Sequence, residues 1–110
     1  ELTELAARFD AGERRGDGVH LREQARFELA LRGDTSRALA IARRNWDVQK
    51  ETADARILLE AALAAHDAAS ARPVLDWMRS AHVEDVQLAR LAAQFDPQFD
   101  PQSNQSGGKA

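Results

Sequence analysis

A short internal echo constrains the fold of this chain more than any other feature of the sequence. The segment Gly33-Asp34-Thr35-Ser36-Arg37-Ala38 returns 33 residues later as His66-Asp67-Ala68-Ala69-Ser70-Ala71. A period in the low thirties, built from paired helices, is typical of solenoids, in which each repeat packs on its neighbours. The echo therefore predicts helical hairpins that stack side by side.

The composition favours the same architecture. The chain has 110 residues, enough for one compact domain or for a short part of a longer array. Its apolar residues are mostly alanine and leucine, with two Trp, four Phe and no Tyr. Alanine is the best intrinsic helix former and lets helices approach closely, whereas the β-branched residues that favour strands are few. We expect an all-α fold.

Charge, cysteine content and hydropathy exclude several classes of protein. The formal net charge is −3 with both signs interspersed, so we expect no nucleic-acid partner. The absence of cysteine excludes disulfides and cysteine-based metal sites. No apolar run approaches the length of a membrane span, so we expect no membrane insertion and a soluble protein, cytoplasmic or periplasmic. Because arginine outnumbers lysine and the chain starts at Glu1, we expect the C-terminal fragment of a bacterial protein.

Apolar side chains recur at helical spacing in six segments. A short helix is predicted over 2–11, a glycine-rich connection follows up to residue 18, and Gly33 is placed to end the second helix in a left-handed conformation. The last helix is predicted to run to Phe95. Cap candidates precede three of the other helices: Asp34 or Thr35, Thr52 and Asp67. Glu84-Asp85 supply negative charge at the start of the last helix, where the helix dipole favours it.

Three residues lie in the second helix of one or other predicted helix pair, and each has its own expected role. Pro73 removes a backbone hydrogen bond, so its helix is either kinked or starts late. Trp46 lies on the apolar stripe of its helix and is predicted to be a core residue. Trp77 lies beside such a stripe, and we expect it to pack at an edge against the last helix or to belong to a partner surface.

The end of the chain is polar and rich in helix breakers. Phe-Asp-Pro-Gln occurs twice in tandem over 95–102, and the segment 103–110 is Ser-Asn-Gln-Ser-Gly-Gly-Lys-Ala. Such a composition cannot bury enough apolar surface to pack, so a disordered tail is predicted over 96–110. The duplicated tetrapeptide is either a low-complexity slip or a short docking motif.

The helix pairs resemble the tetratricopeptide repeat. The matching positions are the apolar pair Ala25 and Leu58, the turns Gly33-Asp34 and His66-Asp67, and the helix-crossing alanines Ala38 and Ala71. The resemblance implies two units, 19–51 and 52–83, and a capping helix over 84–95, in a repeat domain over 19–95. The implied shape is a short right-handed superhelix of about six antiparallel helices. The sequence departs from the family where Arg22 and Ala55 replace its Trp, Leu29 and Ala62 its Tyr, and His66 its turn glycine.

In that family the first helix of each unit lines a concave, ligand-facing groove. Carried over by position, the partner-binding residues are Glu23, Phe27, Leu31, Arg56, Glu60 and Leu63. The apolar members would anchor a protein segment and Arg56 would pair with a carboxylate. The alternative for Phe27 and Leu31 is a place in the core. The basic and asparagine pattern with which some relatives hold a peptide C-terminus is absent, so that ligand class is not expected.

These features favour a non-catalytic protein-interaction module without cofactor or metal. His20, His66 and His82 lie far apart at predicted helix ends and lack the spacing of metal ligands. The alternative is a structural or self-associating end of a larger repeat scaffold, present as a homodimer, because two units fall below the usual three for a stable stack. A third class, an enzyme, would need a cluster of perturbed carboxylates that the sequence does not offer.

Overall fold

The computed structural model describes residues 20–99, and this part of the chain is helical without any strand. The prediction of an all-α protein is therefore confirmed for these residues. The elements, in chain order, are α2 (Leu21–Phe27), the π-helical turn η1 (Glu28–Arg32), α3 (Thr35–Val48), α4 (Thr52–Ala64), α5 (Ala68–Ala81) and α6 (Val86–Phe95). The helix expected over 2–11, which would be a sixth, and the end of the expected tail lie outside the described residues.

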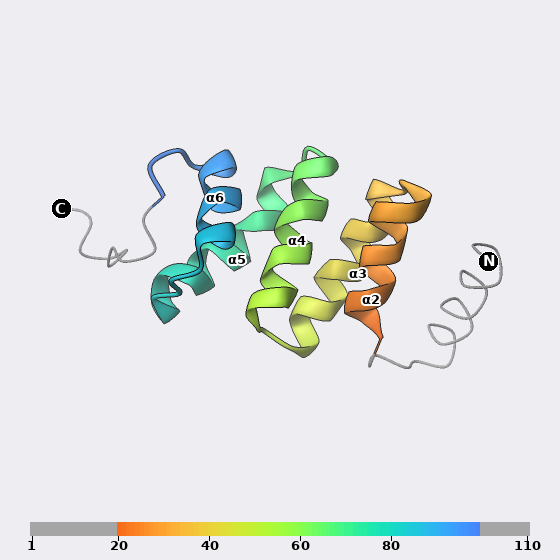
Figure 1. Cartoon of the computed structure of the whole chain (residues 1–110), viewed down its shortest axis with the longest axis horizontal. Coiled ribbons are helices and arrows are strands. Elements are labelled where there is room, and N and C mark those ends of the chain that lie inside the picture. Colours follow the sequence, from red (N-terminus) through yellow and green to blue (C-terminus); the bar gives the residue numbers. More distant parts are fainter. Residues whose placement is uncertain (1–19, 100–110) are drawn as a thin grey trace.

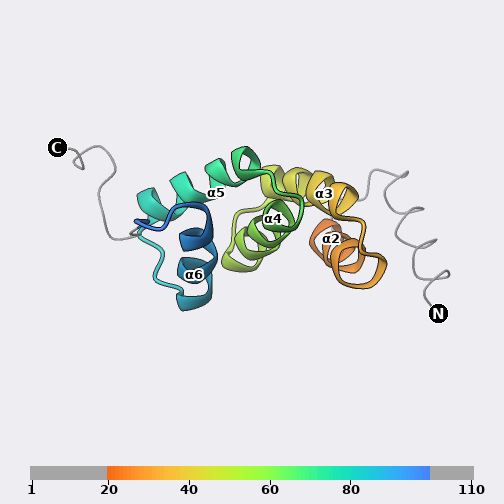
Figure 2. The ribbon, with the colours of Figure 1, turned by 90° about the horizontal axis from the view of Figure 1, so that it is seen from above.

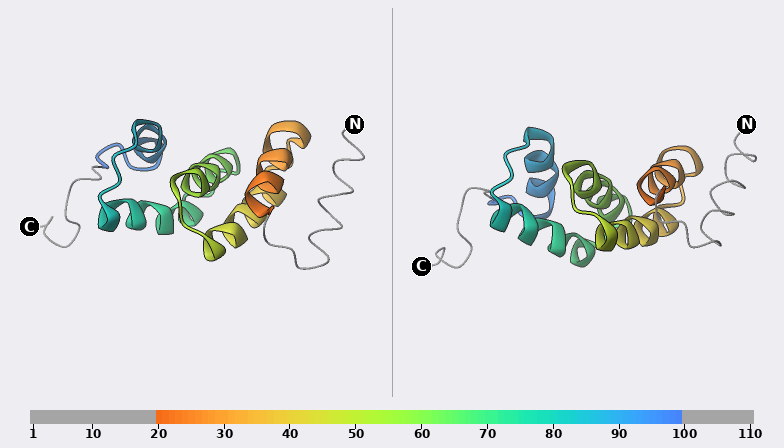
Figure 3. Two further views of the ribbon diagram at one scale, coloured as in Figure 1. Left: turned by 60° about the horizontal axis from the view of Figure 1, so that its bottom comes forward. Right: turned by 90° about the horizontal axis from the view of Figure 1, so that it is seen from below.

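The helices are arranged in two layers. In Figure 2, α2, α4 and α6 form one layer and α3 and α5 form the other, and both views of Figure 3 show the same arrangement. Successive helices run in opposite directions along the chain (Figure 1). Helix α4 lies in the middle and contacts all four other α-helices, so the centre of the core is built around it.

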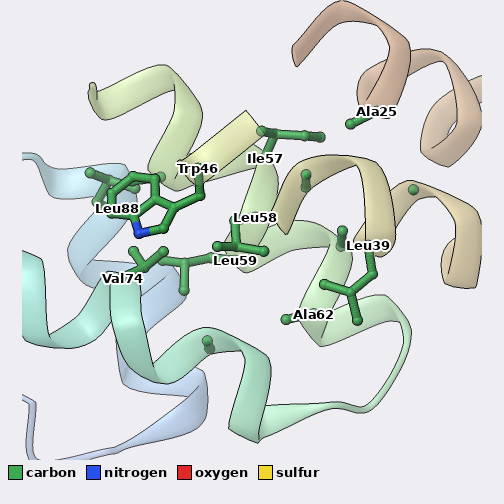
Figure 4. Packing of buried hydrophobic residues seen from close by; sticks show 14 of the residues in the cluster. Ala25, Leu39, Trp46, Ile57, Leu58, Leu59, Ala62, Val74 and Leu88 are labelled. Atoms are coloured by element: carbon green, nitrogen blue, oxygen red, sulfur yellow. The ribbon is translucent and has the colours of Figure 1, made fainter. Parts of the chain in front are cut away.

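The core is filled mainly by small residues at the places where helices cross. Ala25, Ala38, Ala55 and Ala71 each have no exposed surface, which allows the helix axes to approach closely. Helix α4 adds three larger apolar side chains, Ile57, Leu58 and Leu59, which are completely or almost completely buried; Figure 4 shows Leu58 and Leu59 in the cluster with Val74 and Leu39. The alanine-rich composition is thus used for close packing of helices.

Three aspartates cap the helices that follow them. The Oδ1 atoms of Asp34 and Asp67 accept hydrogen bonds from the backbone N–H of Arg37 (3.0 Å) and of Ser70 (3.2 Å). Asp85 caps α6 in the same way through the N–H of Leu88, at 2.9 Å. These bonds satisfy helix N-terminal donors that have no partner inside the helix. The cap predicted at Asp67 is confirmed, and of the two candidates Asp34 and Thr35 the cap is Asp34. Asp85, one of the two acids predicted to supply negative charge at the start of the last helix, is also its cap.

The cap predicted at Thr52 is wrong. Helix α4 is capped by Glu51 and Asp54, which form a reciprocal capping box in which each side chain accepts from the other residue's backbone N–H. Thr52 is the first residue of the helix itself. Thr52 was predicted as the cap because short hydroxyl side chains are common caps, whereas glutamate is not among the preferred caps. Glu51 caps this helix because Asp54 follows three residues later and completes the capping box.

Three helical segments end at a residue in the left-handed conformation. Gly33, His66 and His82 have φ angles of 65°, 56° and 51°. After His66 and His82 the next residue's N–H donates to a carbonyl five residues earlier, Asp67 to Ala62 (2.9 Å) and Val83 to Met78 (3.1 Å), which is the Schellman motif. At Gly33, which follows the π-helical turn η1, the N–H of Asp34 donates to the carbonyl of Glu28, six residues earlier, at 2.9 Å. The prediction for Gly33 is confirmed, and the echo is explained as a left-handed residue followed by an aspartate that caps the next helix.

Replacing His66 or His82 by glycine is expected to raise the free energy of unfolding by about 0.5–1 kcal/mol each. A side chain with a Cβ atom is strained at positive φ, and glycine is not. Gly33→Ala, at the third position with a left-handed backbone, is the matched control and should lower stability by about 1 kcal/mol. Urea denaturation followed by circular dichroism measures all three variants. Equal stability of the glycine variants and the parent would contradict the strain argument.

Pro73 lies inside α5. The helix begins at Ala68, so the alternative in which it starts late is wrong. Pro73 is exposed and is the sixth residue of the helix, where it leaves the carbonyl of Ala69 without its usual N–H partner. An exposed carbonyl can bind water instead, which makes a proline tolerable on this side of the helix.

The two tryptophans pack against each other. Their ring centroids are 5.2 Å apart and their planes meet at 84°, an edge-to-face arrangement. Trp46 is 4% exposed, as expected for a core residue. Trp77 is half-buried at the edge of the core, and its ring contacts the ring of Trp46 on α3. The pair joins α3 and α5, the two helices of one layer.

The first residues after α6 pack on α5. Asp96 Oδ2 accepts a hydrogen bond from Arg79 Nη2 at 3.2 Å, and the Arg79 guanidinium lies 4.7 Å from the centre of the Phe99 ring. Phe99 also packs against the core. Residues 96–99, which the sequence assigns to the tail, are therefore held against the helices through Arg79. The first Phe-Asp-Pro-Gln copy ends α6.

Candidate functional site

A buried carboxylate joins three helices beneath the candidate site. Asp54 of α4 has no exposed surface. Its Oδ1 accepts hydrogen bonds from Arg22 Nη1 of α2 (3.2 Å), Asn45 Nδ2 of α3 (2.8 Å) and Gln49 Nε2 (3.1 Å), and its Oδ2 accepts from the backbone N–H of Glu51 at 3.0 Å. A buried charge is tolerated only when it is paired and hydrogen-bonded in this way. The network fixes Arg22 relative to α4.

Above this network lies a cleft of about 240 Å³ between α2 and α4. Its lining consists of Arg22, Glu23, Arg26, Ala53 and Arg56. Arginines therefore supply three of its five lining residues, and the small side chain of Ala53 leaves the space open between them. The cleft belongs to the layer formed by α2, α4 and α6 (Figure 2).

The three guanidinium groups have different partners. Arg22 pairs with buried Asp54, and Arg26 forms an ion pair with Glu60 of α4. Arg56 donates a hydrogen bond to the side-chain amide oxygen of Gln87 on α6. Among the interactions of residues 20–99, Arg56 has no carboxylate partner, so its charge is balanced less directly than the charges of the other two.

These bonds repeat along the layer. Arg22 reaches from α2 to Asp54 at the start of α4, and Arg56 reaches from α4 to Gln87 at the start of α6. The two acceptors, Asp54 and Gln87, are 33 residues apart, and the two donors are 34 residues apart. One arginine of α2 and one of α4 thus each link their helix to the next helix of this layer.

The structure brings together only part of the predicted partner-binding set. Glu23 and Arg56 line the cleft, and Glu60 lies beside it in its ion pair with Arg26. Leu31 is 60% exposed on η1, and Leu63 is half-buried near the end of α4; neither lines the cleft.

Phe27 requires a correction. It is only 4% exposed, so it cannot offer its ring to a partner as an apolar anchor, and the alternative of an interior residue applies. The resemblance to the tetratricopeptide repeat assigned Phe27 to the groove by its position in the repeat, but a repeat position does not determine whether a side chain faces a neighbouring element or solvent.

Sequence reasoning missed Arg22 and Arg26. Their spacing of four residues places them on one side of α2, which was the available signal. Arg22 was instead interpreted as a departure from a family tryptophan. The partners that give these residues their positions, Asp54 and Glu60, lie 32 and 34 residues further along the chain.

Two other hollows carry no comparable charge pattern. One of about 360 Å³ between α3 and α5 has Trp46 and Leu58 in its lining with Arg43, Asp47 and Asp67, so both signs are represented. Another, of about 440 Å³, has Arg72 and Arg79 in its lining together with Asp76 and Asp96, so both signs are again represented. The α2–α4 cleft is therefore the better candidate.

No group of three His, Asp or Glu residues within residues 20–99 is arranged to hold a metal ion. None of the helices in this part of the chain is both long enough and apolar enough to span a bilayer.

Comparisons of the chain with protein-family models, with curated proteins and with solved structures found no match.

Proposed function

We propose that this chain is a tetratricopeptide-like, non-catalytic binding module that holds a segment of a partner protein on the face formed by α2, α4 and α6. The observation that carries the proposal is the cleft lined by Arg22, Arg26 and Arg56 on that face. It coincides with two of the residues, Glu23 and Arg56, that the repeat pattern assigns to a ligand-facing groove.

The size of the cleft favours a protein segment over a small molecule. Small-molecule sites usually enclose roughly 300–1,000 Å³, and this cleft has about 240 Å³. A space of this size accepts one side chain of a partner. The rest of the partner segment would then lie along the neighbouring surfaces of α4 and α6.

The chemistry of the lining supports binding without catalysis. General acid–base catalysis uses groups whose proton can be transferred at ordinary pH. Arginine remains protonated in proteins, and Glu23 is the one carboxylate among the lining residues. Hydrogen-bond donors held in fixed positions suit recognition instead.

The proposal predicts that filling the cleft abolishes binding. The probe is a displayed library of random twelve-residue peptides, from which binders to the parent protein are selected. Ala53→Leu places an isobutyl group among the three arginines and should weaken the selected peptides at least about 10-fold, a loss of about 1.4 kcal/mol. Isothermal titration calorimetry measures the affinities.

The matched control is Ala40→Leu, an exposed position on α3 in the other layer. It adds the same side chain to a helix and should leave affinity unchanged. Circular dichroism establishes that both variants remain helical. Failure of the library to yield a binder, or equal binding by the Ala53 variant, would contradict the proposed function.

A further inference from the structure

We infer that the segment bound by this module carries an aspartate or glutamate whose side-chain carboxylate enters the α2–α4 cleft and contacts Arg56. The inference rests on the proposed function and specifies the chemistry of its ligand. It is based on a difference among the three guanidinium groups that line the cleft: among the described residues, two pair with carboxylates of this protein, and one does not.

Charge balance is the first step. Arg22 and Arg26 each have a carboxylate within the protein, Asp54 at 3.2 Å and Glu60 in a short ion pair. Arg56 donates to the neutral amide oxygen of Gln87 and has no carboxylate partner within the described residues. A partner carboxylate would give Arg56 the direct ion pair that the other two arginines already have.

The three arginines also keep N–H donors that are not used within the described part of the protein. A guanidinium has five N–H donors, and the hydrogen bonds found within residues 20–99 use only Nη1 of Arg22, of Arg26 and of Arg56. Those bonds to Asp54, Glu60 and Gln87 also hold the arginines in place before a ligand arrives. Preorganised guanidinium groups with unused N–H donors are suited to bidentate binding of a planar carboxylate.

Glu23 decides between a carboxylate and a phosphate. It is exposed at the cleft, with its Oε2 3.9 Å from Arg22 Nη2. Its negative charge opposes any incoming anion, and it opposes a phosphate of charge near −2 more strongly than a carboxylate of charge −1. A singly charged side chain is therefore the ligand that fits both Arg56 and Glu23.

The experiment compares each selected acidic peptide with its amide counterpart, in which Glu is replaced by Gln or Asp by Asn. On the parent protein the amide peptide should bind about 10-fold more weakly. Arg56→Gln should remove this difference, so that both peptides bind with similar affinity. Glu23→Gln should tighten the acidic peptide a few-fold, because the opposing charge is gone.

Arg43→Gln is the matched control. Arg43 is an exposed arginine on α3, away from the cleft, so this variant removes the same charge from the protein but should keep the 10-fold difference. If net charge alone caused the loss of this difference, the loss would appear equally in the Arg56→Gln and Arg43→Gln variants. That result would overturn the inference.

The remaining outcomes separate this inference from the proposed function. Selected peptides that bind through the cleft, as shown by loss of binding to the Ala53→Leu variant, but contain no enriched acid would overturn the carboxylate and leave the function standing. A phosphoserine peptide that binds more tightly than its glutamate counterpart would also overturn the carboxylate. Absence of any cleft-dependent peptide would contradict both.

Discussion

Replacing Asp54 by asparagine is expected to lower the free energy of unfolding by about 3 kcal/mol, and the melting temperature by roughly 15 °C. The carboxylate accepts four hydrogen bonds in a site without solvent. An asparagine side chain can still accept with one atom, but its amide group meets the N–H of Glu51, so that two donors face each other. Arg22 also loses the charge that balances it.

The control for this variant is Asp76→Asn. The Asp76 side chain is 61% exposed and pairs with Arg79 at 3.5 Å on the helix surface. Exposed pairs of this kind contribute little, so the loss should stay below about 0.5 kcal/mol. Thermal and urea denaturation measure both variants. A similar, small loss for both would mean that the Asp54 network does not hold α2, α3 and α4 together.

Replacing Trp46 by alanine is expected to cost about 3–5 kcal/mol, the second large effect. Its ring is 4% exposed, lies in the core and contacts the edge of Trp77. Trp77→Ala removes the half-buried member of the same pair and should cost less, about 1–2 kcal/mol, because part of that ring already meets water.

A double-mutant cycle over Trp46 and Trp77 isolates the ring contact itself. The coupling is expected at about 1 kcal/mol, the usual value for an edge-to-face pair. If the alanine variant of Trp46 does not fold, Trp46→Phe keeps an aromatic ring in the core and permits the same cycle. Additive effects of the two substitutions would show that the rings do not stabilise each other.

The sequence by itself determined the features that depend on neighbouring residues. The caps at Asp34 and Asp67 and the left-handed turn at Gly33 were predicted correctly, because each depends on hydrogen bonds between residues three to six positions apart. His66 was interpreted as a departure from a turn glycine, although its backbone adopts the same conformation. Local chemistry thus specified where helices begin and end.

The tertiary structure alone decided which side chains of different helices meet. The burial of Phe27, the pairing of Arg22 with Asp54, and the cleft between α2 and α4 depend on how the helices are rotated and how closely they approach. A 33-residue period gives the spacing of similar helices along the chain but not their rotation about their own axes. Side chains that meet across the α2–α4 boundary come from positions more than thirty residues apart, and only packing of the complete core sets that distance.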